Sequence, residues 1–342
     1  MAGTFLNYPF DEELFMQAWA EEPDPVKTAL LDSGVMVEDS QIAGQIAGGG
    51  NLYTIPFYKP LSGTPANYDG STDVPVEETA ADCQSGVVYG RTQGFMARDF
   101  VSDLSGADPM GHIAASVARF WNRYRQAVIL KVLSAIFGIT TPADWKNKHT
   151  AEDVSATADP ALITATHLND LATQACGDNK NIFQLAIMHS DVAKTLENLQ
   201  LLEFWKQTDA NGIQRPVNLA SCNGYTVLID DGVPVEAVGG EGANKALKKY
   251  TTYLLGTDVL RHANGKLDKP GAVPVRDEIT NGGQETLVTR IRETIHPNGF
   301  SFKIPTSSWS ESPTDVQLAA TANWACKFNP KAIPIARLIT NG

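Results

Sequence analysis

The chain has 342 residues, of which 43% are hydrophobic and 19% are charged, and these proportions are ordinary for a globular protein. Its formal net charge of −12 excludes a protein that binds nucleic acid over its whole surface, because phosphate contacts need clustered Lys and Arg. The length predicts two substructures or one large elaborated unit.

The sequence shows no targeting or membrane segment. Its N-terminus, MAGTFLNYPFDEELF, lacks the basic segment and apolar run of a secretory signal. The most apolar run, residues 127–139, is interrupted by Lys131 and is shorter than the roughly 20 residues of a membrane span. We therefore expect a soluble protein that has no membrane partner and is made in a cytoplasm. Scattered cysteines favour reduced, mostly buried thiols over a zinc or redox site: Cys83, Cys176, Cys222 and Cys326.

The first hundred residues predict an arm followed by a hairpin. Residues 10–20 are a candidate amphipathic helix, and the run GQIAGGG predicts a flexible junction. The runs LYTIPFY and SGVVYGRTQGF alternate at period two, so they predict an antiparallel hairpin. The segment between them is long and too polar to form a core. Such a loop is uncommon inside a compact domain unless it has a function, so we expect its partner to be another chain.

Residues 108–138 predict one long amphipathic helix. Asp108 is a side-chain acceptor at the N-cap, Pro109 takes the first helical position, and Gly138 stands where a left-handed residue often ends a helix. At 1.5 Å per residue this helix would be about 40 Å long. Steps of three and four predict one buried stripe: Ile113, Val117, Trp121, Tyr124, Val128, Val132 and Ile136. Four polar residues are expected away from the stripe: Arg119, Asn122, Arg123 and Gln126.

The remaining chain predicts a mixed α+β module. A polar connector over residues 140–160 precedes a helix, the buried strand NIFQLAIMHS, and a second helix with Ser190 at its N-cap. Further strands are expected at residues 225–229, in KKYTTYLLGTDVL and in the closing AIPIARLI. The run at residues 287–295 has a mixed face, which is typical of an edge strand or of an assembled sheet. Ser312, Pro313 and Asp315 resemble a helix-starting capping box.

No catalytic, cofactor or metal site is expected. His189, Ser190 and Asp191 are the residue types of a hydrolase triad, but adjacent residues cannot form the side-chain relay that a triad requires. A strand end with a helix cap is the favoured interpretation there. The sequence contains no phosphate-binding glycine motif and no histidine pair at metal-ligand spacing. A hydrolase is therefore a remote alternative, and we expect a protein that is not an enzyme.

Three passages resemble the major capsid proteins of tailed bacteriophages, which have the Hong Kong 97-type fold. The first is ARDFVSDLSGADPMGHIAASVARFWNRYRQAVILKVLSAIFG, which looks like the approach to the family's spine helix and the helix itself. The second, AIMHSDVAKTLENLQLLEF followed by NGYTVLIDDGVPV, is similar to the strand, helix and strand of the axial domain. The third is the closing SPTDVQLAATANWACKFNPKAIPIARL, which looks like the last peripheral segment. The resemblance implies an α+β, Hong Kong 97-like capsid fold.

The resemblance also implies a division into domains. Its parts are an N-terminal arm (1–50), an extension loop (51–96), a peripheral domain (97–157 and 277–342, with the spine helix at 109–137) and an axial domain (158–276). In the extension loop it predicts inter-subunit contacts by eight residues: Phe57, Tyr58, Lys59, Tyr68, Asp69, Asp73, Glu77 and Glu78. Some relatives form a covalent cross-link through a loop lysine. Lys59 is the only lysine in residues 51–96, but no motif identifies its partner.

The function implied is that of a major capsid protein that self-assembles into the icosahedral head of a tailed double-stranded DNA phage or prophage. The subunits would form hexamers and pentamers in the virion shell, after assembly in the bacterial host cytoplasm. No fused helical scaffold precedes the arm, so a separate scaffolding protein is expected, together with a portal and an optional decoration protein. Packaged DNA would be held without sequence-specific binding. An encapsulin-type bacterial compartment is the alternative with the same fold.

Overall fold

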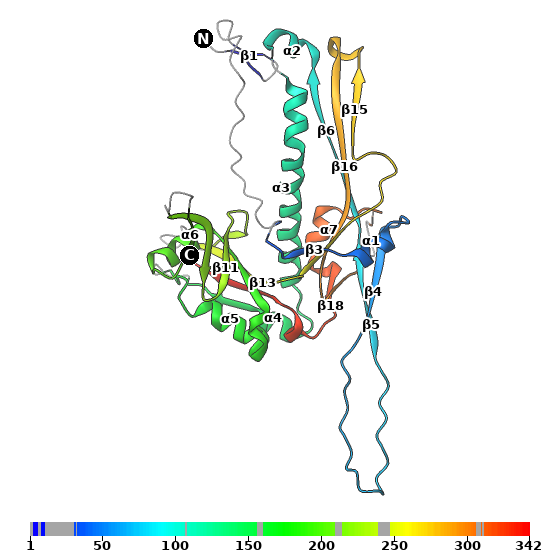
Figure 1. Cartoon of the computed structure of the whole chain (residues 1–342), viewed down its shortest axis with the longest axis vertical. Helices are drawn as coiled ribbons and strands as arrows, with labels where there is room; N and C mark the ends of the chain where they lie inside the picture. Colours follow the sequence, from blue (N-terminus) through cyan, green and yellow to red (C-terminus); the bar gives the residue numbers. More distant parts are fainter. Residues whose placement is uncertain are drawn as a thin grey trace.

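The structure is a computed structural model of the chain. It describes residues 3–5, 8–10, 31, 33–106, 108–155, 160–208, 214–238, 247–305, 309 and 311–342. Helix α3 (Pro109–Phe137) runs along most of the body, with a long sheet beside it and a second module against its C-terminal half (Figure 1). Strands β1 (Gly3–Phe5) and β2 (Tyr8–Phe10) pair near the N-terminus. The helix predicted at residues 10–20 lies outside the described residues, except for Phe10 at the end of β2.

Helix α3 has the predicted bounds, but it ends for a different reason. Oδ1 of Asp108 accepts a hydrogen bond from the backbone N–H of Gly111 at 2.8 Å, and Pro109 begins the helix. The prediction for Gly138 is wrong, because its φ is −77° and the backbone there stays right-handed. Glycine is instead required by close packing, since a Cβ at position 138 would lie 2.2 Å from Oγ1 of Thr321.

The subunit itself buries only the C-terminal half of the predicted stripe on α3. Trp121, Val128 and Val132 are buried. Tyr124 is partly buried, and the prediction of a core position is wrong for Ile113 and Val117, which remain partly exposed in the subunit. Periodicity shows that a helix face is apolar, but it does not show what covers that face. Gln126 was predicted to lie away from the core, yet it is buried and its amide donates a hydrogen bond to Oδ2 of Asp230.

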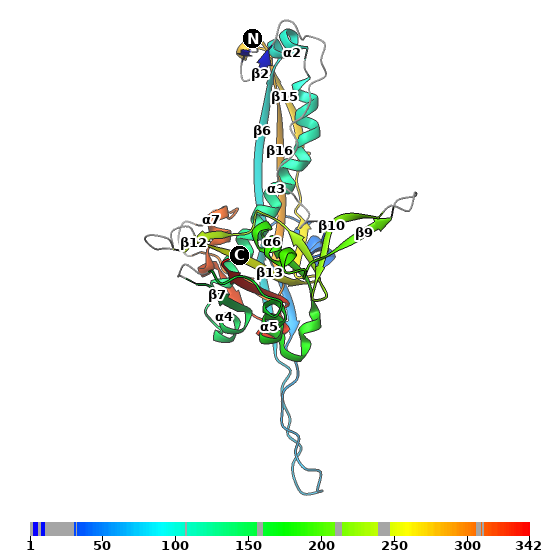
Figure 2. The ribbon, with the colours of Figure 1, turned by 90° about the vertical axis from the view of Figure 1, so that its left-hand side faces the viewer.

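A five-stranded sheet runs beside α3 (Figures 1 and 2). The strand at its centre is β16 (Gln284–Pro297), which pairs along one edge with β6 (Tyr89–Arg98). Its other edge pairs with β15 (Ala272–Asp277) and β14 (Leu260–Asn264), and β14 in turn pairs with β3 (Met36–Glu38). The structure therefore excludes an edge strand at residues 287–295.

An eight-stranded sheet forms the core of the second module. Its order is β7 (Thr150–Asp153), β19 (Ile335–Thr340), β13 (Lys248–Gly256), β8 (Phe183–Met188), β11 (Tyr225–Ile229), β10 (Gln214–Cys222) and β9 (Glu203–Thr208), and β12 (Val235–Ala237) also pairs with β13. The strands predicted by NIFQLAIMHS, residues 225–229, KKYTTYLLGTDVL and AIPIARLI are thereby confirmed.

This sheet is covered on both faces. On one face, Leu185, Ile187 and Leu255 pack in one cluster with the apolar residues of α3 from Val128 to Phe137. On the other face, the helices α5 (His167–Cys176) and α6 (Ser190–Asn198) contribute Leu171 and Leu196 to a second cluster. Because both faces are buried, β8 and β13 read as nearly continuous apolar runs. The spine helix thus forms one outer layer of this module as well as bracing the long sheet.

The segment predicted to be a polar connector is a packed element, so that prediction is wrong. It contains α4 (Ala143–His149) and β7, and Trp145 within it has no exposed surface. The Trp145 indole N–H donates to the carbonyl oxygen of Ile136 at 2.9 Å, and its ring stacks on Phe137. One buried tryptophan among polar residues gives no periodic signal. The domain limits remain a prediction, and the place of β7 and β19 in the eight-stranded sheet bears on them.

Two helix starts are shifted from the predicted residue. The N-cap of α6 is His189 rather than Ser190, because Nδ1 of His189 accepts the backbone N–H of Asp191 at 3.1 Å. The capping box of α7 (Asp315–Ala319) is formed by Thr314 and Gln317. The predicted cap, Ser312, instead accepts the backbone N–H of Gly90 at 2.9 Å.

The hairpin prediction is correct for its first strand and wrong for its second. Strand β4 (Leu52–Tyr58) pairs with β5 (Ala81–Val87), whereas the residues from 89 onward belong to β6 in the long sheet. The remaining elements are short: α1 (Ser40–Ile46), α2 (Asp99–Ser105), β17 (Phe300–Phe302), β18 (Trp324–Cys326), and the 3-10 turns Gly177–Ile182, Thr280–Gly282, Thr321–Asn323 and Pro330–Ala332. Within the described ranges, no helix has both the length and the apolar character needed to cross a bilayer.

Trp145→Ala should lower the free energy of unfolding by about 3–5 kcal/mol, because it empties a buried site and removes the indole hydrogen bond to the Ile136 carbonyl. Urea unfolding of the subunit followed by circular dichroism measures the change. Val316→Ala is the matched control, since Val316 is 79% exposed and should change stability by less than about 0.5 kcal/mol. Equal effects of the two substitutions would contradict this account of the core.

Candidate assembly surfaces

The extension loop leaves the body as two extended legs. Strands β4 and β5 pair from Leu52 opposite Val87 to Tyr58 opposite Ala81, and the backbone N–H of Lys59 donates to Ala80 at 2.9 Å. Beyond that bond, residues 60–79 project away from the rest of the subunit (Figure 1). Each leg of roughly ten residues reaches roughly 30 Å.

The predicted contact residues are exposed, except for one at the base of the loop. Tyr58 is 79% and Tyr68 is 99% exposed, and Lys59, Asp69, Asp73, Glu77 and Glu78 are exposed as well. Phe57 is partly buried, and its ring lies edge-to-face against Phe328 with the centroids 4.8 Å apart. Three apolar residues escaped the prediction although they project equally: Leu61, Val74 and Val76, which are 84%, 78% and 88% exposed. The sequence feature that could have identified them as contact residues is their apolar character within a polar segment.

The tip of the loop carries an ordered turn. Oδ1 of Asp69 accepts the backbone N–H groups of Ser71 at 2.9 Å and Thr72 at 2.7 Å, and Oδ2 accepts the Thr72 hydroxyl at 2.8 Å. These donors, the Ser71 amide first, hold the pKa of Asp69 well below its ordinary value. The turn therefore orders the backbone directly after Tyr68, whose ring is 99% exposed.

Lys59 is held at the base of the loop. Its Nζ lies 3.7 Å from Oδ2 of Asp82, whose Oδ1 accepts Nζ of Lys327 at 3.0 Å. The backbone amide of Cys83 and then Lys327 lower the pKa of Asp82. In the subunit, Lys59 therefore pairs with the same carboxylate that Lys327 binds. The pair between Asp82 and Lys327 joins the loop to the segment after β18.

A buried carboxylate joins α3 to the long sheet. Glu293 on β16 has no exposed side-chain surface, and it accepts the Tyr89 hydroxyl at 3.0 Å and Nε of Arg125 at 2.8 Å. His262 of β14 lies 3.3 Å away from Oε2. Burial acts to raise the pKa of Glu293, but the hydrogen bond with His262 and the charge of Arg125 outweigh it, so this pKa lies below its ordinary value. One side chain thus ties together β16, β6, β14 and α3.

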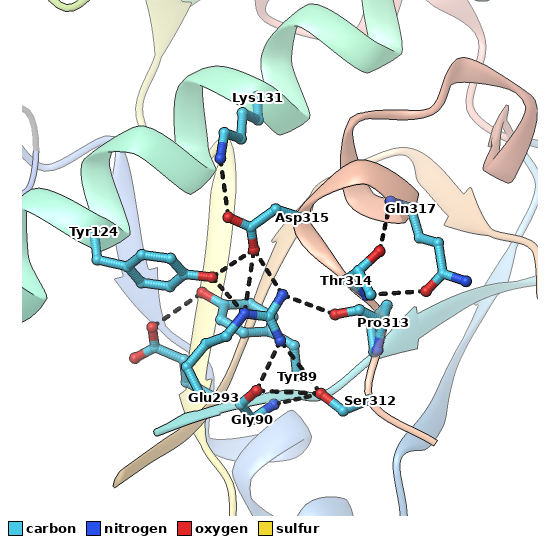
Figure 3. Close-up of polar contacts among 11 residues, drawn as sticks. Tyr89, Gly90, Tyr124, Lys131, Glu293, Ser312, Pro313, Thr314, Asp315 and Gln317 are labelled. Carbon is cyan, nitrogen blue, oxygen red and sulfur yellow. Dashed lines mark hydrogen bonds and ion pairs between the residues drawn. The ribbon is translucent and has the colours of Figure 1, made fainter. Parts of the chain in front are cut away.

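A second polar cluster fixes the segment before α7 to the same place (Figure 3). Asp315 accepts hydrogen bonds from Nη2 of Arg91 at 2.7 Å, the Tyr124 hydroxyl at 2.6 Å and Nζ of Lys131 at 2.9 Å. Arg91 also donates to the carbonyl oxygens of Gly90 and Pro313. Burial opposes ionisation of Asp315, yet its three donors lower its pKa to about 2.

The residues of the hydrolase alternative form a helix cap. Nδ1 of His189 already accepts the backbone N–H of Asp191, so it is not available to remove a proton from Oγ of Ser190, which lies 3.5 Å away. The carboxylates of Asp191 and Asp231 are bound by Tyr250 and by the Ser190 amide. Among the described residues, no group of three or more His, Cys, Asp or Glu side chains is placed to hold a metal ion.

Comparisons with known proteins agree with these features. No family model matches the chain. The curated "Major capsid protein" of Bacillus phage SPP1 is 28% identical over 312 residues, which cover 91% of this chain and 90% of that protein. The capsid of Ralstonia phage GP4 has a TM-score of 0.60 at 11% identity, covering 100% of this chain and 98% of that one. The Cyanophage Pam1 capsid has a TM-score of 0.57 at 10% identity, covering 98% and 99%.

The fold is therefore the α+β, Hong Kong 97-like capsid fold, and the prediction made from the resemblance is confirmed. The sequence likeness to a major capsid protein extends over almost the whole of both chains, and it supports a function in addition to the fold. This chain is a capsid shell protein of a tailed phage, a structural protein rather than an enzyme.

Acid should weaken the contacts of α3 in a defined pH window. The pKa of Asp315 falls from 3.8 to about 2 on folding, so its stabilising effect is complete above about pH 4 and is lost as the pH falls to 2. The pKa of Glu293 is also lowered on folding, so its contribution to stability likewise decreases as the pH falls below its ordinary pKa of 4.5. Asp315→Asn should therefore lower stability at pH 7 and reduce its decline between pH 4 and 2, as measured by urea unfolding. Asp144→Asn, which alters an exposed pair with Lys148, is the control. An unchanged acid slope in Asp315→Asn would contradict this assignment.

Proposed function

We propose that this chain assembles, through hexamers and pentamers, into the icosahedral head of a tailed phage or prophage that packages double-stranded DNA. The observation that carries the proposal is the projecting loop, in which Tyr68, Val74 and Val76 are almost fully exposed. Apolar side chains at the end of a projecting arm favour burial against another molecule. Heterologous contacts of this kind build a closed shell when their geometry returns on itself.

The same proposal assigns roles to the parts of the chain. Residues 1–50 are the arm, 51–96 the extension loop, 97–157 and 277–342 the peripheral domain, and 158–276 the axial domain. The exposed residues of the loop, from Tyr58 to Glu78, make inter-subunit contacts in the shell. The first half of α3 offers Ile113 and Val117 to the assembly rather than to the subunit core, which accounts for an apolar stripe that the subunit leaves partly exposed.

The proposed partners follow from this role. They are other copies of the chain, a separate scaffolding protein, a portal and an optional decoration protein, brought together in the bacterial host cytoplasm. The net charge of −12 favours a shell that holds packaged DNA without gripping it.

Electron microscopy of the protein expressed with its neighbouring scaffolding gene tests the proposal. We expect closed shells of uniform diameter. A protein that stayed monomeric under these conditions would contradict the proposal. Shells that formed without a scaffold and enclosed a cargo enzyme would favour the encapsulin alternative.

Replacing residues 61–79 by a short Gly-Ser turn should leave a folded subunit that does not form shells. Strands β4 and β5 stay intact in this variant, so the core contacts of Tyr53 and Gln84 are kept. Circular dichroism and urea unfolding should match the parent protein, while sedimentation should show loss of the shell fraction. Shells formed in normal yield by this variant would show that the loop has no inter-subunit role.

A further inference from the structure

Strands β4 and β5, the base of the extension loop, are held by the face of β16 that points away from α3. Side chains alternate along a strand, so Arg292, Thr294 and His296 share the face opposite to that of Glu293. The three contacts run from Arg292 to Oδ1 of Asn51 at 2.8 Å, from Thr294 to the Tyr53 hydroxyl at 2.8 Å, and from Nε2 of His296 to Oε1 of Gln84 at 3.3 Å. One face of one strand thus holds both legs of the loop.

The apolar contacts of the loop base form a cluster of their own. Tyr53 and Ile55 of β4 pack with Ile42 and Ile46 of α1 and with Val88, separately from the two clusters on the faces of the eight-stranded sheet. Strands β4 and β5 pair with each other as a two-stranded sheet, and such a sheet is marginally stable in water by itself. The loop base is therefore a unit that can open locally while the two larger cores stay folded.

His296 occupies a closed site in this junction. It is 1% exposed, its ring lies edge-on to Tyr53 with the centroids 6.0 Å apart, and the ring of Trp324 lies 6.4 Å away. Oε1 of Gln84 also accepts the backbone N–H of Gly299 at 2.9 Å, which holds the amide beside the imidazole. A charged imidazolium in this site would be out of contact with solvent, which costs free energy.

The charged groups near His296 do not offset that cost. Arg261 stands opposite His296 across β14 and β16, and its guanidinium binds Oδ2 of Asp39 at 2.9 Å. Tyr53 stays neutral, because burial raises the pKa of its hydroxyl. Burial, and after it the charge of Arg261, lower the pKa of His296 from 6.5 to about 4, against the opposing effects of the Phe300 carbonyl and Asp39. The site therefore fits a neutral imidazole.

We propose that His296 is a pH-sensitive switch: its neutral form keeps the loop base docked on β16, and its protonation favours release of β4 and β5 from the sheet. Because the pKa is lower in the docked state than in the open state, protons bind the open state more tightly. Docking is therefore complete above about pH 6.5 and weakens as the pH falls toward 4. Between pH 7 and 5 Asp82 and Glu293 stay ionised, since their pKa values are lowered from 3.8 and 4.5.

Hydrogen exchange of free subunits at pH 7 and pH 5, corrected for the intrinsic exchange rate at each pH, tests the switch without requiring shells. A pKa of 6.5 in the open state and about 4 in the docked state predicts that exchange of residues 52–58 and 81–87 rises about twentyfold. Residues 128–137 should remain far better protected at both pH values, because the opening is local. A rise of less than about threefold, or equal exchange rates in the loop base and in α3, would overturn the proposal.

Replacement of the histidine separates the switch from other effects of acid. His296→Phe keeps a ring in the site but cannot bind a proton, so loop-base exchange should change by less than about twofold between pH 7 and 5. His296→Gln, which keeps a donor for Gln84, should lose the pH response as well. His149→Phe is the matched control, since His149 is a second buried histidine with a lowered pKa but lies on α4, and this variant should keep the twentyfold rise. A pH response like that of the parent in both His296 variants would overturn the proposal.

Discussion

The buried carboxylate of Glu293 is the constraint on which the architecture depends. A charge without exposed surface is tolerated only when opposite charge and hydrogen-bond donors surround it, and here the donors come from α3 and β6, with His262 of β14 beside them. Moving α3 away from the sheet would remove Arg125 from this charge. The energetic cost of that state fixes where the longest helix meets the longest strand.

Just beside this point, Asp315 at the start of α7 adds a second tie, to α3 and β6. Tyr89 and Arg91 lie close together on β6, and Tyr124 and Arg125 are adjacent on α3, so the two clusters form one polar seam at the middle of the helix. Beyond the seam toward the C-terminus, α3 is buried against the eight-stranded sheet. Before it, the helix is partly exposed. The seam therefore separates the half of α3 that is buried in its own subunit from the half that the subunit leaves partly exposed.

The features that were predicted correctly from the sequence are those that depend on residues close together in the chain. Asp108 and Pro109 define the start of α3 because capping depends on neighbours within four residues, and the apolar runs of β8 and β13 identify strands buried on both faces. The extension loop was recognised because a long polar segment cannot form its own core. At α7 the prediction of Ser312 as the cap was wrong by two residues, since Thr314 and Gln317 form the capping box. Ser312 instead contacts Gly90, 222 residues away in the sequence, and a local pattern does not contain that contact.

The rest depended on contacts that local patterns do not contain. Glu293 contributed to the mixed face for which an edge strand or an assembled sheet was predicted, because its partner Arg125 lies 168 residues away in the sequence. The burial of Trp145 was missed because a single apolar residue among polar ones forms no periodic pattern in the sequence. Burial of α3 was overestimated at Ile113 and Val117, since an apolar stripe looks the same whether its cover is in the same subunit or in another one.

Hydrogen exchange of free subunits and assembled shells tests the central claim that neighbouring subunits complete this chain. In free subunits the amides of residues 60–79, apart from those of Ser71 and Thr72 in the Asp69 turn, should exchange almost as fast as in an unfolded chain, because they lie outside any strand. In shells these amides should slow by about tenfold or more, together with the exposed half of α3, while residues 128–137 stay equally protected in both states. Equal exchange of residues 60–79 in subunits and shells would contradict the account.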